Sequence, residues 1–194
     1  AMGIKSPLDE TPALALGASD VNLLEMVNAY ATVANNGRHV EPVLVTKVVD
    51  RDGEVIYEAT EEGEQVIPYR SAFFMQQLLR AGVNDGGGTS QSLRRYVGQY
   101  AREVDFGGKT GTSNNHSDAW FVGTSPGLVG GAWVGGEYRS IHFRTGALGQ
   151  GSRTALPIFG YFMESVLGDP LFHDKYARKY GAPKEKIDAS LYEV

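Results

Sequence analysis

The segment of this sequence best suited to chemistry on an anionic acyl substrate consists of Lys109, Thr110, Gly111 and Thr112. An ammonium group and two hydroxyl groups on one strand can together hold a carboxylate by hydrogen bonds. Gly111 has no side chain, so the backbone of a ligand can approach the strand edge there. The amide of Thr112 can then point at a developing oxyanion. A lysine and two threonines on a strand are also typical of a solvated sheet face, so the residue types alone define no function.

Two other patterns in the same region compete with this interpretation. Gly108-Lys109-Thr110 matches the end of a phosphate-binding P-loop, which requires a glycine five positions before Gly108. That position is Glu103, whose carboxylate would repel phosphate, and the segment continues as a strand instead of opening a helix. The sequence therefore argues against a nucleotide site.

Residues 123–127 match the G-x-S-x-G pattern of a nucleophile elbow centred on Ser125. An elbow needs a helix directly after the serine, whereas residues 128–133 look like a strand. A serine hydrolase that uses Ser125 with His142 or His173 therefore stays as the less favoured alternative.

Metal, cofactor and nucleic-acid sites find little support. The four histidines are scattered, without H-E-x-x-H or i, i+4 spacing, and there is no cysteine for disulfides, thiolate ligands or cysteine catalysis. The formal net charge of −5 argues against a nucleic-acid partner, because binding to phosphates requires a basic face. We therefore expect no metal ion, no organic cofactor and no nucleic-acid partner. The four scattered histidines are His39, His116, His142 and His173.

The N-terminal part of the chain carries clear helix signals. Asn22 is a good N-cap, and Glu25 follows three residues later, as in a capping box. Asn36 and Gly37 supply a left-handed stop. These residues predict one amphipathic helix between them.

The next part of the chain is predicted to form a hairpin and a second helix. Two runs rich in β-branched residues, 43–49 and 54–57, flank an Asp-Arg-Asp-Gly turn. Apolar spacing predicts a helix over residues 71–81, and the glycine-rich residues 84–88 are interpreted as a flexible connector.

The strand carrying Lys109 is expected to open an antiparallel meander. Its three strands are predicted over residues 104–113, 119–124 and 128–135, because only short turns separate them. A last helix is predicted from near Ser152 to just before Gly168.

Several stretches together resemble class A penicillin-binding proteins, the peptidoglycan synthases. Residues 107–112, 120–123 and 133–135 closely resemble the strand of the family's third motif and the hairpin that follows it. Residues 16–37 resemble the family's helix, and Pro42 with the later Asp-Gly hairpin fits the same pattern. The resemblance runs from about residue 12 to residue 167 and is more specific than the Lys-Thr-Gly triplet alone.

The resemblance assigns roles to individual residues. The family's domain uses S-x-x-K, with the serine nucleophile, then S-x-N and K-[ST]-G. Lys109, Thr110 and Gly111 match the third motif, and Thr112 holds the position of the second oxyanion-hole amide. By resemblance, Lys109 and Thr112 are catalytic, while Thr110, Gly111 and Thr112 bind the terminal carboxylate of a D-alanyl-D-alanine stem peptide or a β-lactam.

The departures from the family pattern indicate a partial domain. No serine has lysine three positions later, and Ser92 with Arg95 comes nearest. Residues 113–115 spell S-x-N, but they adjoin the Lys-Thr-Gly strand, whereas the family's second motif comes earlier on a separate loop. We therefore expect the C-terminal half of a transpeptidase domain, inactive alone, whose N-terminal half is a missing partner.

These observations lead to the following expectations. The fold class is α+β, an antiparallel sheet flanked by helices in a partial β-lactamase/transpeptidase-like fold. Residues 1–170 form the domain portion, and residues 171–194 form a charged tail. The parent protein cross-links peptidoglycan at the periplasmic face of the bacterial inner membrane, although a non-enzymatic peptide- or β-lactam-binding module stays open. The chain itself is expected to be soluble and to self-associate through the edge of residues 128–135.

Overall fold

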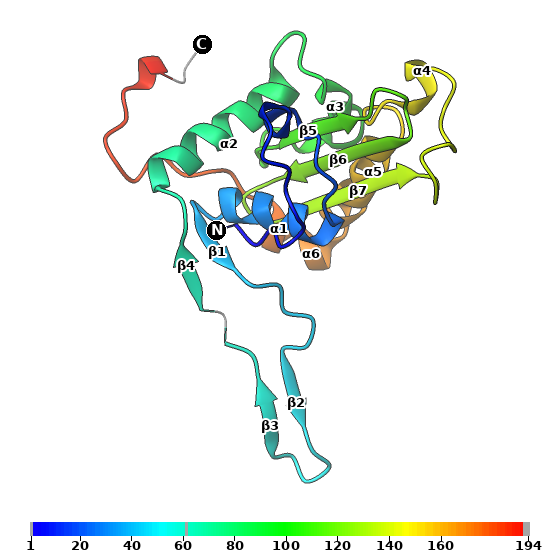
Figure 1. Cartoon of the computed structure of the whole chain (residues 1–194). Helices are drawn as coiled ribbons and strands as arrows, with labels where there is room; N and C mark the ends of the chain where they lie inside the picture. The colour runs from blue at the N-terminus through cyan, green and yellow to red at the C-terminus, as the bar shows by residue number, and fades with distance from the viewer. Residues whose placement is uncertain (1, 61, 192–194) are drawn as a thin grey trace.

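A three-stranded antiparallel sheet organises the computed structural model, which describes residues 2–60 and 62–191 (Figure 1). Its strand order is β5-β6-β7, and each strand pairs with its neighbour in sequence. The predicted meander is confirmed, with the first strand starting three residues later than expected. The strands are β5 (Gly107–Thr112), β6 (Asp118–Thr124) and β7 (Val129–Gly135).

Helices cover both faces of this sheet. Glycines leave room for them: a Cβ at Gly130 would contact the ring of Phe159 in α5 (Ala155–Gly168), whereas one at Gly131 would contact Val27 in α1 (Leu23–Ala34). Because consecutive residues of a strand point to opposite faces, α5 and α1 lie on opposite sides. Helix α2 (Tyr69–Asn84) packs against β5 on the α1 side.

The main hydrophobic core lies between α5 and the sheet. Phe121 of β6 packs against Phe159, with ring centroids 5.3 Å apart. Leu93 and Val97 close this core from a short helical segment that the sequence analysis did not predict. This segment comprises η2 (Gln91–Leu93), α3 (Arg94–Val97) and η3 (Gly98–Tyr100).

Local signals at the ends of α1 work largely as predicted. The side chain of Asn22 accepts a hydrogen bond from the amide of Leu24, and Asn36 and Gly37 both have positive φ. The carboxylate of Glu25 accepts hydrogen bonds from the hydroxyl and amide of Ser6, and the hydroxyl bond is the main cause of its lowered pKa. Glu25 thus ties the N-terminal segment to the helix.

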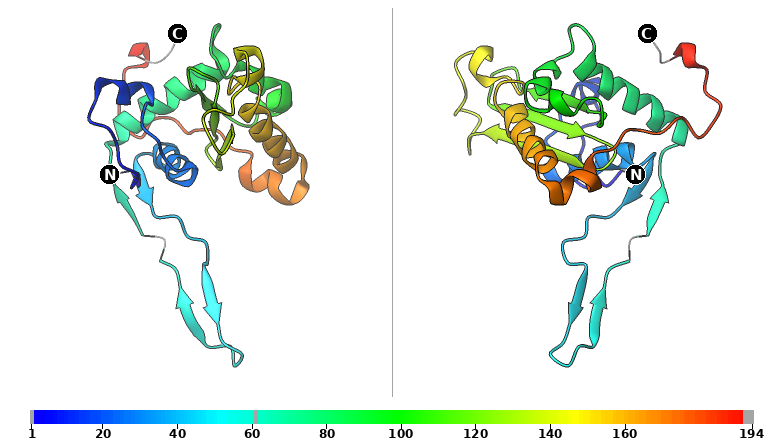
Figure 2. Two further views of the ribbon diagram at one scale, coloured as in Figure 1. Left: turned by 45° about the vertical axis from the view of Figure 1, so that its right-hand side comes forward. Right: turned by 180° about the vertical axis from the view of Figure 1, so that it is seen from behind.

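The predicted hairpin forms and projects away from the body (Figures 1 and 2). At its base, β1 (Arg38–Val40) pairs with β4 (Gly63–Gln65); further out, β2 (Lys47–Val49) pairs with β3 (Val55–Glu58). The side chain of Asp50 accepts hydrogen bonds from the amides of Asp52 and Glu54, and these bonds fix the turn. The hairpin follows from local sequence, but its projection does not.

The last part of the chain contains more structure than a tail. Helix α6 (Pro170–Tyr176) is capped by Asp169, whose side chain accepts a hydrogen bond from the amide of Leu171, and it packs against α5. The chain then returns past the sheet, where the amide of Tyr180 donates to Asp105. The division at residue 170 stays a prediction, and residues 1, 61 and 192–194 lie outside the described residues.

The smaller elements are η1 (Pro12–Leu16), α4 (Gly146–Gly149) and η4 (Ala189–Leu191). Within residues 2–60 and 62–191, no helix has the length and apolarity needed to cross a membrane.

Candidate functional site

The free edge of β5 presents the backbone groups of Thr110 and Thr112. The amide of Ser113 donates to the carbonyl of Asp118 over 3.0 Å, and the register pairs Thr112 with Ala119. Because backbone groups alternate in direction along an antiparallel pair, the amides of Thr110 and Thr112 point away from β6. The Thr112 amide therefore points to the open edge of the strand, and its role as an oxyanion donor stays a prediction.

The side chain of Thr112 is held by a distant loop. The amide of Gly151 donates to Thr112 Oγ1 over 3.1 Å. Since the oxygen accepts this bond, the hydroxyl proton is free to be donated to a ligand. Thr112 is also exposed, so a ligand can reach it.

Gly151 has no space for a side chain at this position. A Cβ on Gly151 would overlap the carbonyl oxygen of Trp120 and lie 2.6 Å from that of Gly111. The backbone of Gly151 therefore lies directly on the β5–β6 pair. The sequence gives no sign of this contact, because Gly151 lies 39 positions from Thr112 and no local pattern joins them.

Lys109 and Gly111 lie on the opposite face of β5 from the two threonine side chains. Lys109 is exposed, and its ammonium group donates to the carbonyl of Thr110 over 2.6 Å. Within the part of the chain that the structure describes, no carboxylate forms an ion pair with it. At Gly111, a Cβ would lie 3.1 Å from the Cβ of Trp120, so packing also favours glycine there.

The loop before η2 covers the other end of the β5 edge. Ser90 Oγ donates to the carbonyl of Gly108 over 3.2 Å, and Thr110 Oγ1 donates to Thr89 Oγ1 over 2.8 Å. The amide of Ser90 also donates to the carbonyl of Gly82. The glycine-rich stretch predicted as a flexible connector thus leads into a loop end fixed on the candidate strand. Sequence analysis overlooked Thr89 as a neighbour of the site.

The S-x-N look-alike at residues 113–115 forms the β5–β6 turn, as its position predicted. Ser113 Oγ accepts a hydrogen bond from the amide of Asp118. The carboxylate of Asp118 accepts hydrogen bonds from Ser117 Oγ over 2.7 Å and from Trp133 Nε1 over 3.1 Å. Burial by itself would raise the pKa of Asp118, but these hydrogen bonds and the charge of Arg139 lower it. Side-chain hydrogen bonds thus hold the β5–β6 turn in place at the end of β5.

The geometry opposes the Ser125 hydrolase alternative. Ser125 is fully buried, its hydroxyl donates to the carbonyl of Leu128 over 3.1 Å, and the chain runs on into β7 instead of a helix. His142 and His173 each bond to a backbone carbonyl instead, that of Phe143 and of Leu167.

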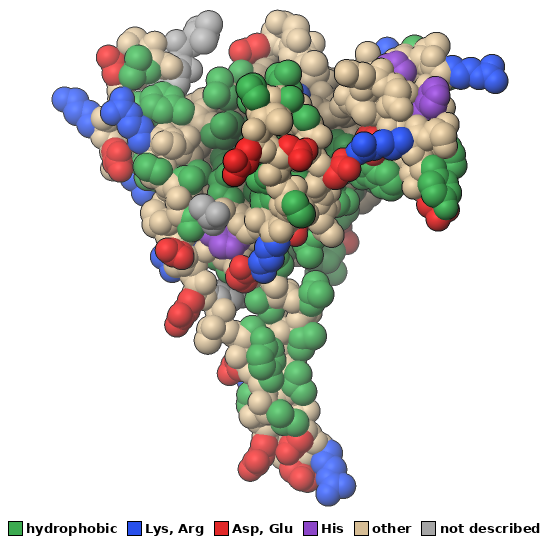
Figure 3. Space-filling view, viewed as in Figure 1, with side chains coloured by type: hydrophobic (Ala, Val, Ile, Leu, Met, Phe, Trp, Pro, Cys, Tyr) green, Lys and Arg blue, Asp and Glu red, His purple; other side chains and the backbone are tan. Residues whose placement is uncertain are grey.

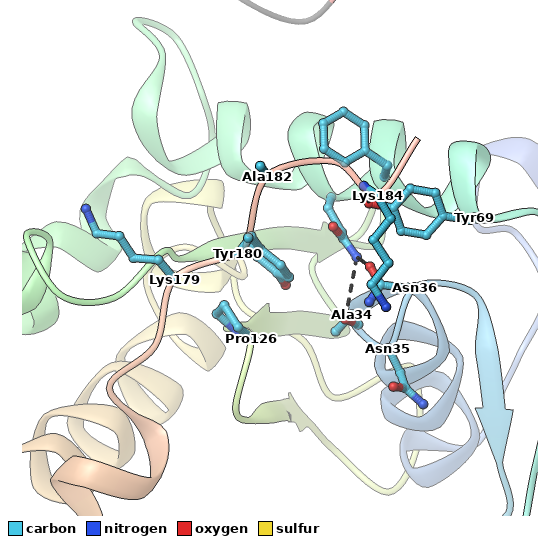
Figure 4. A pocket seen from close by; sticks show the side chains of 12 residues that line it. Ala34, Asn35, Asn36, Tyr69, Pro126, Lys179, Tyr180, Ala182 and Lys184 are labelled. Carbon is cyan, nitrogen blue, oxygen red and sulfur yellow. Dashed lines mark hydrogen bonds between the residues drawn. The ribbon is translucent and has the colours of Figure 1, made fainter. Parts of the chain in front are cut away.

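Two hollows of the surface are lined by no residue of the Lys-Thr-Gly strand. One of about 220 Å³ lies where Tyr69, Gln76, Tyr180 and Lys184 meet the end of α1 (Figure 4). Gln76 donates to the carbonyl of Val33 there, and burial raises the pKa of Tyr180 to about 12. A second, of about 310 Å³, lies between α2 and α3. Among the described residues, no group of three or more acidic or histidine side chains could hold a metal ion.

Known proteins are similar to this chain in both sequence and fold. The model of the penicillin-binding protein transpeptidase domain matches residues 7–133. Penicillin-binding protein 2D of Bacillus subtilis is 34% identical over 171 residues, 87% of this chain and 24% of that protein. Penicillin-binding protein 1A of Aquifex aeolicus is 39% identical over 155 residues, 79% of this chain and 20% of that protein.

Solved structures agree with this assignment. Penicillin-binding protein 1A from Haemophilus influenzae has a TM-score of 0.76 at 27% identity, covering 91% of this chain and 30% of that one. PonA1 from Mycobacterium tuberculosis, solved in complex with penicillin V, has a TM-score of 0.71 at 26% identity, covering 95% of this chain and 50% of that one. The predicted α+β, β-lactamase/transpeptidase-like fold class is confirmed.

The chain spans about a fifth to a quarter of the length of the curated relatives named above. These relatives confirm the resemblance to class A penicillin-binding proteins. Since the family model covers residues 7–133, well over half of the sequence, this chain belongs to the penicillin-binding protein transpeptidase domain family.

Proposed function

We propose that this chain is the C-terminal half of a serine-type D,D-transpeptidase domain and supplies its substrate-holding strand. In the parent protein, a serine outside this chain attacks the D-alanyl-D-alanine amide carbonyl. A bond forms from the serine oxygen to the acyl carbon, and the terminal D-alanine leaves with a proton. An amine of a neighbouring stem peptide then displaces the serine, which completes a peptidoglycan cross-link.

The residues of β5 divide this work. The amide of Thr112 stabilises the oxyanion, and the hydroxyl of Thr112 binds the substrate carboxylate. The hydroxyl of Thr110 joins it by exchanging its bond to Thr89 for one to the carboxylate. Lys109 supplies positive charge and assists proton transfer near the serine, while Gly111 lets the substrate backbone approach. The observation that carries the proposal is the outward-pointing amide of Thr112 beside a hydroxyl whose oxygen already accepts Gly151, so that both can donate to one ligand.

The parent protein acts on the periplasmic face of the bacterial inner membrane, where peptidoglycan stem peptides and β-lactams are encountered. Residues 1–170 form the domain portion, and residues 171–194 are a C-terminal extension of it. A non-enzymatic binding module of the same fold is the second candidate, since no serine of this chain has lysine three positions later. The transpeptidase and the binding module differ in turnover, because the module binds stem peptide without releasing D-alanine.

This chain alone is expected to form no covalent adduct with a fluorescent penicillin, because it lacks the S-x-x-K nucleophile. Intact mass spectrometry after incubation measures the result directly. A longer form of the parent that includes the upstream half of the domain should gain the mass of one penicillin. A stoichiometric adduct on any serine of this chain, Ser125 above all, would contradict the proposal.

The outer edge of β7 is expected to mediate self-association. Among the described residues, β7 pairs only with β6. The amide of Ser125 donates to the carbonyl of Leu128, so by alternation the amide of Val129 points to the open edge, where another strand can pair. Sedimentation at several concentrations should show association that Val129→Pro reduces, because proline removes this amide. If the chain sediments as a monomer at high concentration, with or without Val129→Pro, self-association through β7 is refuted.

A further inference from the structure

The projecting hairpin, residues 41–60 and 62, is called the arm below, and its strands pair with no other strand of the described chain. Strands β2 and β3 pair only with each other, and in both further views the arm extends away from the sheet and its helices (Figure 2). A hairpin of two strands is marginally stable by itself in water. A partner that packs against the arm would add the burial that it lacks.

The arm exposes large apolar side chains on both of its faces. Val48 pairs with Tyr57 on one face, and the neighbouring Ile56 points to the other. Apolar side chains follow much of its length in Figure 3, and contiguous exposed apolar surface of this kind marks interaction sites. Eight such side chains are between 39% and 90% exposed: Val43, Leu44, Val45, Val48, Val49, Val55, Ile56 and Tyr57.

The arm and its base are also strongly acidic. Residues 41–64 contain eight Asp or Glu and two Lys or Arg, a net charge of −6 against −5 for the whole chain. Both basic side chains already have acidic neighbours, Lys47 with Glu58 at 3.3 Å and Arg51 with Asp52 at 3.7 Å. Among the described residues, Glu54 and Glu62 form no ion pair. The remaining negative charge is therefore available to a partner.

This charge decides between possible occupants. A second copy would bring one acidic arm against another, and an anionic membrane surface would repel the arm. A cationic segment gains from both the carboxylates and the apolar side chains. We propose that the arm is a docking surface for a separate protein that presents a basic segment with interspersed apolar residues.

A fluorescent decapeptide of alternating lysine and valine is the probe for this chemistry, with binding followed by anisotropy. It should bind the chain, whereas a glutamate–valine peptide and a lysine–serine peptide should not. The double variant Leu44→Ser/Ile56→Ser and the double variant Glu54→Gln/Glu62→Gln should each weaken binding at least about tenfold. The charge variant should also reduce the salt dependence. Leu171→Ser and Glu185→Gln, both exposed and outside the arm, are the matched controls.

Four results would overturn the proposal. Equal binding of the lysine–serine peptide would mean general attraction of polycations. Self-association that Ile56→Ser abolishes would mean that the arm binds a second copy of this chain. Binding to phosphatidylglycerol vesicles would mean that the arm binds a membrane surface. The chain has no cysteine, so maleimide labelling of Ile56→Cys in this chain reports the arm alone. In the longer parent, mass spectrometry of peptides measures the label at position 56 specifically. Equal labelling rates in this chain and the longer parent support the proposal, whereas protection in the parent would mean that its own polypeptide covers the arm.

Discussion

Replacing Lys109 with Ala in the longer parent protein is expected to slow acylation by a β-lactam at least about a hundredfold. Loss of one preorganised electrostatic donor typically costs on the order of 3 kcal/mol of barrier. Lys109 fits this role because it is exposed beside the β5 edge and no carboxylate of the described chain neutralises it. Stopped-flow measurement of the second-order acylation rate constant gives the effect.

Two variants sharpen this test. Thr112→Val removes a hydroxyl but keeps the backbone amide, so its effect should be milder than that of Lys109→Ala. Lys186→Ala removes an exposed lysine far along the chain and should leave the rate unchanged. Wild-type rates for both Lys109→Ala and Thr112→Val would show that β5 has been assigned wrongly.

Gly151→Ala in the same parent is expected to lower the acylation rate constant at least about fivefold, the equivalent of one lost hydrogen bond of average strength, about 1 kcal/mol. The added Cβ would overlap the carbonyl oxygen of Trp120, so the loop must move off the strand pair. The bond from the Gly151 amide to Thr112 would then break, and the Thr112 hydroxyl would lose its fixed orientation. We therefore expect Gly151 to act as a positioning residue through Thr112.

A double-mutant cycle separates positioning from simple destabilisation. If Gly151 acts through Thr112, adding Gly151→Ala to Thr112→Val should cost less than it does in the wild-type background. Gly181→Ala, where a Cβ meets nothing within 4 Å, is the matched control. Full additivity in the cycle, or a rate loss explained by a lower melting temperature alone, would contradict the positioning role.

Local chemistry made much of the fold predictable. The ends of α1 were predicted from Asn22, Asn36 and Gly37, and the structure uses all three as expected. The meander followed from apolar strands and short turns. The functional assignment of β5 came from the family resemblance, because a lysine and two threonines on a strand are common on solvated faces.

Some errors came from signals that were present but misinterpreted. The helix that ends near Gly168 was predicted to be the last one, yet the side chain of Asp169 caps α6 and Pro170 is its first residue. Asp at the N-cap and Pro at N1 are both favourable there. In residues 91–100, the spacing of Leu93 and Val97 matches one buried helical face, but the segment was too short to stand out.

Other features have no local signal in the sequence. The contact of Thr89 with Thr110 and that of Gly151 with Thr112 join residues 21 and 39 positions apart. Such contacts depend on how helices pack on the sheet, which periodicity does not specify. The outward direction of the arm is of the same kind, since its turn chemistry fixes the hairpin and not its orientation.

A crystal structure of the longer parent protein after reaction with penicillin tests most directly whether β5 holds the substrate. The acyl carbonyl oxygen should lie within about 3 Å of the Thr112 amide nitrogen, the usual hydrogen-bond distance. The penicillin carboxylate should accept hydrogen bonds from the hydroxyls of Thr110 and Thr112, with the ammonium group of Lys109 nearby. An acyl group bound elsewhere, with the Thr112 amide facing only solvent, would contradict the claim that this strand holds the substrate.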